Sequence, residues 1–329
     1  MNHVYRLVWS EVRCAWVAVC EIARGEGKGS ASAGRKARRA RTASDADCDL
    51  DPVIDGAPVD GGAPLGWRSG VGLALTAWMV ASAWAAPPVP PAPNALPTGA
   101  SLAAGQAQVT QSGSQMTVQQ GTDKTIINWQ SFSIGQSAGV NFQQPNSNSV
   151  ALNRVTGSDP SQIFGRLSAN GQVFLLNPNG VMFGPGAQVD VGGILAGAMR
   201  ITDADFLAGR YRFTDGRGVV TNQGTISARD AGLVALLAPE VINEGIIRAR
   251  RGTVVLAAGE AITLTNSASG LTVVVEQGAI NALVENRQLV SAEDGTVYLS
   301  ARAAGALQRA VIRNSGVVEA RGAVQVGGR

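Results

Sequence analysis

Carboxylates are the main candidates for acid–base chemistry in this sequence, because its histidine and cysteine residues lie at one end. All three cysteines and the single histidine fall within the first 50 residues. The rest of the chain therefore lacks the residues of Ser-His-Asp triads, thiol nucleophiles and His-ligated metal sites. The closely spaced acidic pairs are Asp203 and Asp205, Glu293 and Asp294, and, across one turn, Glu240 and Glu244.

These acidic pairs give weak support for catalysis. Asp203 lies in the stretch ITDADFLAG and is expected to cap a short helical turn or loop. The other two pairs are expected to be solvated charges at corners of the fold. The sequence also has no calcium-binding repeat of the GGxGxD type. It therefore predicts no catalytic residues, no metal site and no cofactor.

Residues 171–186, GQVFLLNPNGVMFGPG, contain the most informative local pattern in the chain. Residues 173–176 form an unbroken apolar run, which is typical of a strand buried on both faces or stacked inside a sheet. Asn177, Pro178, Asn179 and Gly180 follow, and each has the turn preference that its position requires. A tight turn between two buried strands is expected.

Short strands separated by glycine, asparagine and serine are expected on both sides of this stretch. Before it, they are predicted at residues 115–118, 125–129, 140–142, 150–155 and 163–167. After it, a repeated motif appears as NQGTISA at 222–228, NEGIIRA at 243–249 and NSGVVEA at 314–320. Each copy is followed by a glycine and a short apolar strand, and residues 295–299 form a further copy of that second half.

The repeat predicts a solenoid, because its first two copies are 21 residues apart and each contains two short strands. We expect an all-β, right-handed parallel β-helix of the pectin-lyase-like kind, with an N-terminal cap near residues 100–130. The asparagine of each motif should hydrogen-bond to the next coil, and the glycine should adopt a positive φ. The pattern stops in mid-repeat, so we expect the protein to continue beyond residue 329.

The first 85 residues have a different character from the remainder. Residues 71–84 form an apolar run of 14 residues, the length of a signal-peptide core. Small residues follow it, and cleavage is expected between Ala85 and Ala86. Residues 1–28 resemble the extended signal-peptide region of very large exported proteins of Gram-negative bacteria. We therefore expect an extended signal peptide over residues 1–85 and export of the mature chain.

The mature chain is expected to begin with a proline-rich linker at residues 86–100, followed by one domain at residues 101–329. Residues 87–97 contain six prolines, which favours an extended segment. Charged residues make up 16% of the chain and the net charge is +3, which is too mild to indicate nucleic-acid binding. An arginine cluster at residues 35–41 lies in the segment expected to be removed.

Two stretches, TIINWQSFSIGQSAGVNFQQPNSNSVALNRVTG and IFGRLSANGQVFLLNPNGVMFGPGAQVDVGGILAGAM, carry a specific resemblance. They resemble the secretion domain of the filamentous haemagglutinin family, the exported partners of two-partner secretion systems. The resemblance covers about residues 100 to 329. Asn177 to Gly180 match the family's NPNG secretion motif residue by residue. A second motif, of the NPNL type, has only a loose relative here at residues 146–149.

The resemblance implies a secretion address rather than an enzyme. It implies passage through the inner-membrane export machinery, recognition by a cognate outer-membrane barrel with periplasmic docking domains, and β-helix folding at the cell surface or after release. The expected parent protein is an adhesin that meets a host-cell receptor. Two alternatives stay open: a surface adhesin module that itself binds host glycan or protein, and a carbohydrate-active β-helix enzyme, which would need acids and a basic residue clustered on one face.

Overall fold

The computed structural model of the 329-residue chain describes residues 5–10, 15–20, 89–267, 270–305 and 310–320. The predicted cleavage site at Ala85 and Ala86 and the apolar run before it lie outside these residues. The chain divides into two compact units, residues 1–80 and 81–329. In the first, β1 (Tyr5–Ser10) pairs antiparallel with β2 (Ala15–Cys20). No helix in the described part is long and apolar enough to cross a bilayer.

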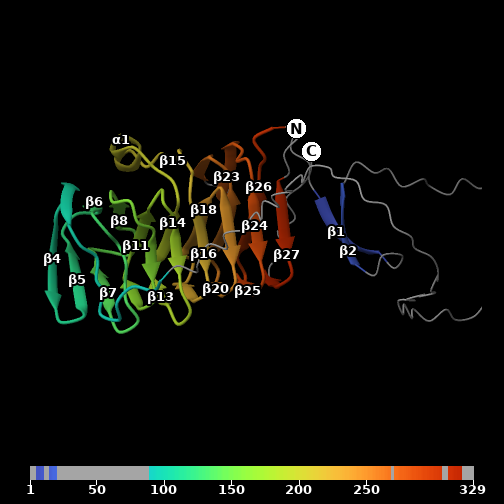
Figure 1. The fold of residues 1–329 in the computed structure, drawn as a ribbon. Helices are drawn as coiled ribbons and strands as arrows, with labels where there is room; N and C mark the ends of the chain where they lie inside the picture. Colours follow the sequence, from blue (N-terminus) through green and yellow to red (C-terminus); the bar gives the residue numbers. More distant parts are fainter. Residues whose placement is uncertain (1–4, 11–14, 21–88, 268–269, 306–309, 321–329) are drawn as a thin grey trace, which may run out of the picture. The chain divides into compact units, whose positions relative to one another are not determined.

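The second unit winds through three sheets in turn (Figure 1). The first sheet contains β4 (Ala107–Ser112), β5 (Gln115–Gln120), β7 (Gly139–Gln143), β10 (Arg166–Ala169), β13 (Gln188–Val191), β17 (Thr225–Ala228), β20 (Ile246–Ala249), β25 (Leu289–Ser291) and β28 (Val317–Glu319). The second contains β3 (Ser101–Ala104), β6 (Lys124–Trp129), β8 (Val150–Val155), β11 (Gln172–Leu176), β14 (Gly193–Gly197), β18 (Leu233–Ala238), β21 (Thr253–Ala258) and β26 (Thr296–Ala301). The third contains β9 (Ser161–Ile163), β12 (Val181–Phe183), β16 (Val219–Asn222), β19 (Glu240–Asn243), β24 (Leu283–Asn286) and β27 (Val311–Asn314).

Neighbouring coils pair in parallel in all three sheets, so the second unit is the predicted right-handed parallel β-helix. The exceptions are β3 and β4, which pair antiparallel with β6 and β5 at the N-terminal ends of their sheets. They cover edges that would otherwise present unpaired backbone groups. The cap expected near residues 100–130 is therefore confirmed.

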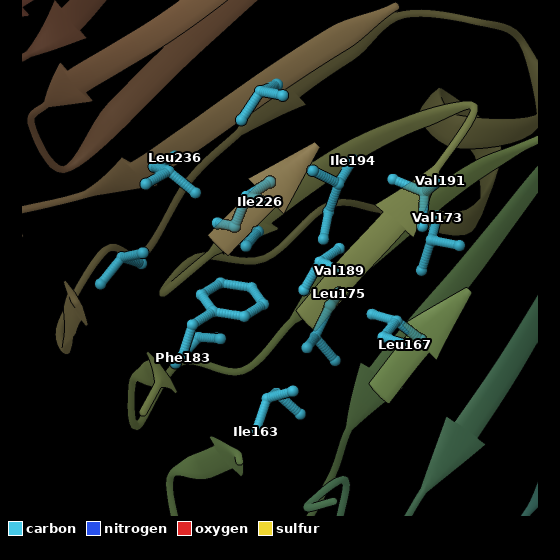
Figure 2. Packing of buried hydrophobic residues seen from close by; sticks show 14 of the residues in the cluster. Ile163, Leu167, Val173, Leu175, Phe183, Val189, Val191, Ile194, Ile226 and Leu236 are labelled. Carbon is cyan, nitrogen blue, oxygen red and sulfur yellow. The ribbon is translucent and has the colours of Figure 1, made fainter. Parts of the chain in front are cut away.

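Alternate residues of the strands fill the interior of the β-helix. Figure 2 shows Val173 and Leu175 of β11 beside Leu167 and Phe183 from the adjacent strands of their coil. Each is almost completely buried, because the coils above and below cover it. This explains the branched apolar residues at these positions, which pack well on stacked pleated strands.

The second sheet is buried on its outer face as well. Phe174 and Leu176, which alternate with Val173 and Leu175, belong to a second hydrophobic cluster. An outer layer made of α1 (Asp203–Leu207), β15 (Tyr211–Phe213), β22 (Ala261–Ser267) and β23 (Gly270–Gln277) contributes Phe206, Phe213 and Ile262 to that cluster. The apolar run at residues 173–176 is therefore buried on both faces, as expected.

Two expected segments differ in the structure. Residues 163–167, expected as one strand, are divided between β9 and β10 by a corner at Phe164 and Gly165. The proline-rich segment expected as an extended linker packs on the domain instead: Leu96 is buried, Ser137 N donates to Pro93 O at 2.8 Å, and Thr98 forms a β-bridge with Ser131.

The repeated asparagines form a ladder along the third sheet, which is buried at Asn222, Asn243 and Asn286 and reaches the surface at Asn314. Asn222 Nδ2 donates to Asn243 Oδ1 at 2.8 Å, Asn243 Nδ2 to Asn286 Oδ1 at 2.7 Å, and Asn286 Nδ2 to Asn314 Oδ1 at 2.8 Å. The expected coil-to-coil bonding is confirmed, but the expected positive φ at the following glycines is wrong. At Gly224, a Cβ would lie 2.7 Å from the carbonyl oxygen of Ala187. Glycine is needed there because adjacent coils approach closely.

Candidate functional site

The Asn177–Gly180 turn connects β11 of the second sheet to β12 of the third. Gly180 N donates to Asn177 O at 2.9 Å, which closes the turn, and Asn177 N donates to Gly197 O of the next coil at 2.9 Å. Ser161 N of the preceding coil donates to Gly180 O at 3.0 Å. The turn is therefore a stacked corner, hydrogen-bonded to the coils on both sides.

The side chain of Asn177 is completely buried and forms four hydrogen bonds. Its Nδ2 donates to Asp159 O at 2.9 Å and to Ser161 Oγ at 3.1 Å. Its Oδ1 accepts from Asn179 N at 3.0 Å and from Asn179 Nδ2 at 3.2 Å. Because every hydrogen-bonding position is used inside the protein, this amide cannot contact a partner while the domain is folded.

Asn179 and Gly180 contribute in different ways. Asn179 is exposed, and its Nδ2 also donates to Gly157 O at 2.9 Å. Gly180 has φ of +117°, and a Cβ there would lie 2.9 Å from Val219 O. Pro178 is buried between them. Of the four motif residues, only Asn179 presents its side chain to solvent.

The loop at residues 146–149 has a similar local geometry. Asn148 N donates to Asn146 Oδ1 at 2.9 Å, as Asn179 N does to Asn177 Oδ1. Asn146 Nδ2 donates to Asp123 Oδ1 at 2.8 Å. This shared Asx turn was visible in the sequence only as two asparagines spaced two residues apart.

One acidic pair is separated, a second is ion-paired with arginines, and the third is exposed to solvent. Glu240 begins β19 and Glu244 follows its end, so an extended strand holds them about 13 Å apart and not across one turn. Asp203 is not the helix cap: Thr202 caps α1, and Asp203 pairs with Arg154 at 2.5 Å. Glu293 and Asp294 are exposed. The described residues contain no group of three or more potential metal ligands.

A shallow depression of about 370 Å³ lies on the outer face of the first sheet. Its polar lining includes Asn141, Ser168, Asp190 and Arg229. Ser168 Oγ donates to Asn141 Oδ1 at 3.0 Å, whereas the Asp190 and Arg229 side chains form no hydrogen bond or ion pair among the described residues.

Two carboxylates of the outer layer predict how stability depends on pH. Hydrogen bonds from Thr202 and then Arg210 hold the pKa of Asp205 below its ordinary value, and bonds from Thr263 and then Arg212 do the same for Glu276. Both groups therefore stabilise the folded state above their unfolded pKa values, and this contribution is lost as the pH falls through the lowered folded values.

The melting temperature is accordingly expected to fall as the pH drops through and below the ordinary values of 3.8 and 4.5. The double variant Asp205→Asn, Glu276→Gln should show a flatter profile in that range, measured by circular dichroism, with Glu293→Gln as the exposed control. Parallel profiles for the double variant and the wild type would contradict this assignment.

Comparisons with known proteins agree with this architecture. The TPS secretion domain model matches residues 94–328, and the extended signal peptide of type V secretion systems matches residues 1–46. The HMW1 secretion domain from Haemophilus influenzae is similar in structure, with a TM-score of 0.59 and 31% identity, covering 66% of this chain and 57% of that one.

Two curated relatives are heme/hemopexin-binding proteins of Haemophilus influenzae. One is 42% identical over 219 residues and the other 36% over 229 residues. Each match covers 63% of this chain and 24% of the relative, so the chain spans about a quarter of their length. The signal peptide and the domain match indicate export to the cell surface or the medium. The chain belongs to the TPS secretion domain family.

Proposed function

We propose that this domain is the secretion address of a larger exported adhesin, read by a cognate outer-membrane transporter through Asn177, Pro178, Asn179 and Gly180. The observation that carries the proposal is the burial of Asn177 in a corner that is hydrogen-bonded to both neighbouring coils. A partner can contact that amide only before the corner folds. Recognition therefore precedes folding, as a chain that crosses the outer membrane unfolded requires.

Folding outside the cell gives export a direction. The N-terminal coils can form as soon as they emerge, because β3 and β4 cap their first edges. Each later coil then pairs with the one before it. A stacked coil cannot re-enter the pore without losing its hydrogen bonds and buried core, so the domain acts as the nucleus on which downstream repeats are added.

The activity of the whole protein is a separate matter. The relatives are named for binding heme or hemopexin, but this chain spans about a quarter of their length. Histidine and cysteine, two common ligands of heme iron, do not occur after residue 50. We therefore assign export to this domain, and we do not transfer the binding activity of the relatives to it.

Direct binding of a host glycan is the second candidate function, and the depression on the first sheet favours it. Asn141 and Ser168 offer amide and hydroxyl groups, and Asp190 and Arg229, whose side chains have no hydrogen-bond or ion-pair partner in the described part of the chain, offer charges. An assay of the folded domain on host cells, with Asp190→Ala and Arg229→Ala as variants, tests this function. Equal retention of the wild type and the variants would count against it.

Release that depends on the transporter tests the primary proposal. Cells making the chain together with its cognate transporter are expected to release the protein, whereas cells lacking the transporter are expected to retain it. Mass spectrometry of the released protein should show Ala86 as its first residue. Equal release from both strains would refute the transporter assignment, and retention of residues 71–84 would refute the cleavage site.

A further inference from the structure

The outer face of the second sheet is completed by segments that come later in the chain. Ile126, Leu152, Phe174 and Leu195 stand side by side in register on β6, β8, β11 and β14. All four are buried in the outer hydrophobic cluster. Their cover comes from residues 199–213 and from the β22–β23 hairpin. When the chain emerges N-terminus first, the four residues of this apolar column emerge before the segments that cover them.

The first part of that cover is held at both ends by two cations from the first coils. Lys124 Nζ donates to Phe206 O at 3.1 Å and to Leu207 O at 2.7 Å, at the C-terminal end of α1. Arg154 Nη2 donates to Ile201 O at 3.0 Å and to Asp203 Oδ1 at 2.5 Å, at the N-terminal end. We call Lys124, Arg154 and α1 together the α1 clamp.

The aromatic contacts beneath the clamp depend on its closure. The Phe206 ring packs edge-on against Phe174 with centroids 6.0 Å apart, and Tyr211 packs against Phe174 at 5.2 Å. Lys124 Nζ lies 5.9 Å from the centre of the Phe206 ring. A helix of five residues is not stable in isolation, so α1 exists because these contacts hold it.

We propose that Lys124 and Arg154 support export by holding α1 against the first coils of the β-helix. In this way they prevent those coils from unfolding again once they have emerged. The inference rests on the proposed function. Both cations lie within the segment that folds first, whereas their backbone acceptors arrive about eighty and fifty residues later along the chain. Closure of the clamp thus links the β6–β8 coils to the chain that follows the secretion motif.

The sequence provides a direct readout of the clamp. Lys124 is the only lysine after residue 36, so the mature domain has a single ε-amine. In the closed clamp that ammonium group is half-buried and donates to two carbonyl oxygens, so an amine-specific reagent should modify it more slowly than in the open clamp. The rate of modification at Lys124, followed by peptide mass spectrometry, therefore measures opening.

The first arm of the test uses the refolded domain. Arg154→Met removes the hydrogen bonds at the other end of α1 and is expected to raise the modification rate of Lys124 about tenfold, which corresponds to about 1.4 kcal/mol. Arg248→Met is the matched control, because Arg248 is exposed and forms no hydrogen bond or ion pair in the described structure. It should leave the rate unchanged. An unchanged rate in Arg154→Met would overturn the proposal.

The second arm measures export in cells that carry the transporter. Lys124→Met and Arg154→Met should each reduce released protein about tenfold relative to Arg248→Met. Lys124→Arg keeps a positive charge and N–H donors and should restore release relative to Lys124→Met. Faster modification without lower release would overturn the role in export. Failure of Lys124→Arg to restore release would do the same, as would a loss of release that tracks global melting alone. Wild-type release that does not need the transporter would refute the proposed function instead, and the first arm would still decide whether the clamp closes.

Discussion

Asn179→Ala is expected to reduce release into the medium about tenfold, equivalent to about 1.4 kcal/mol of lost recognition, while the refolded domain keeps nearly its wild-type melting temperature. The side chain is exposed, and its loss removes hydrogen bonds to Gly157 O and to the buried Asn177 Oδ1, which keeps its bond from Asn179 N. The expected cost is about 1 kcal/mol, or roughly 3 °C. Release and thermal melting, measured on the same variant, provide the comparison.

Asn177→Ala should behave differently, because it removes a completely buried amide. Asp159 O, Ser161 Oγ and Asn179 N would each lose a partner. A cost of about 3 kcal/mol, or roughly 9 °C in melting temperature, is expected together with the loss of release. If release in both variants declines only in proportion to stability, the motif is a structural corner and the site assignment fails.

Gly180→Val is expected to lower the melting temperature by roughly 12 °C, from a cost of about 4 kcal/mol. Valine resists the φ of +117°, and its Cβ would approach Val219 O at 2.9 Å. Release should be lost as well, because the corner could not form outside the cell.

Gly186→Val is the matched control for this prediction. Gly186 also has a positive φ, +84°, but a Cβ there would meet no atom within 4 Å. Gly186→Val therefore introduces the backbone strain without the steric clash. We expect it to lower the melting temperature by about half as much as Gly180→Val does. Equal melting temperatures for the two variants would show that contact with the neighbouring coil adds nothing at Gly180.

The repeating part of the fold was predictable because its signals are local. Residues 150–155 were expected to form a strand, and β8 spans Val150–Val155. The outer layer was not predicted, because its strands pair with partners that are distant in the sequence. For example, β15 pairs with β22, about fifty residues later. A hint was present at residues 173–176, because a strand that is apolar on both faces requires a layer outside the helix.

The turn at residues 177–180 was located from the sequence, but the different burial of its two asparagines was not. Turn preferences are the same for a buried and an exposed asparagine, so only the stacking of coils distinguishes Asn177 from Asn179. Likewise, Gly224 and Gly180 look alike in sequence, yet only Gly180 has a positive φ. Close approach between coils depends on a neighbour about twenty to forty residues away, which local patterns do not encode.

The α1 clamp also bears on how the domain would carry mechanical load at a cell surface. A parallel solenoid pulled from its ends separates one coil at a time, because each coil is bonded only to its neighbours. Coils β24–β28 follow that rule. Lys124 and Arg154 instead join the first coils to residues 201–207, so tension reaching them must break several layers at once. Pulling would therefore unfold the C-terminal coils one at a time. Unfolding would stop at the N-terminal coils, which resist a higher force.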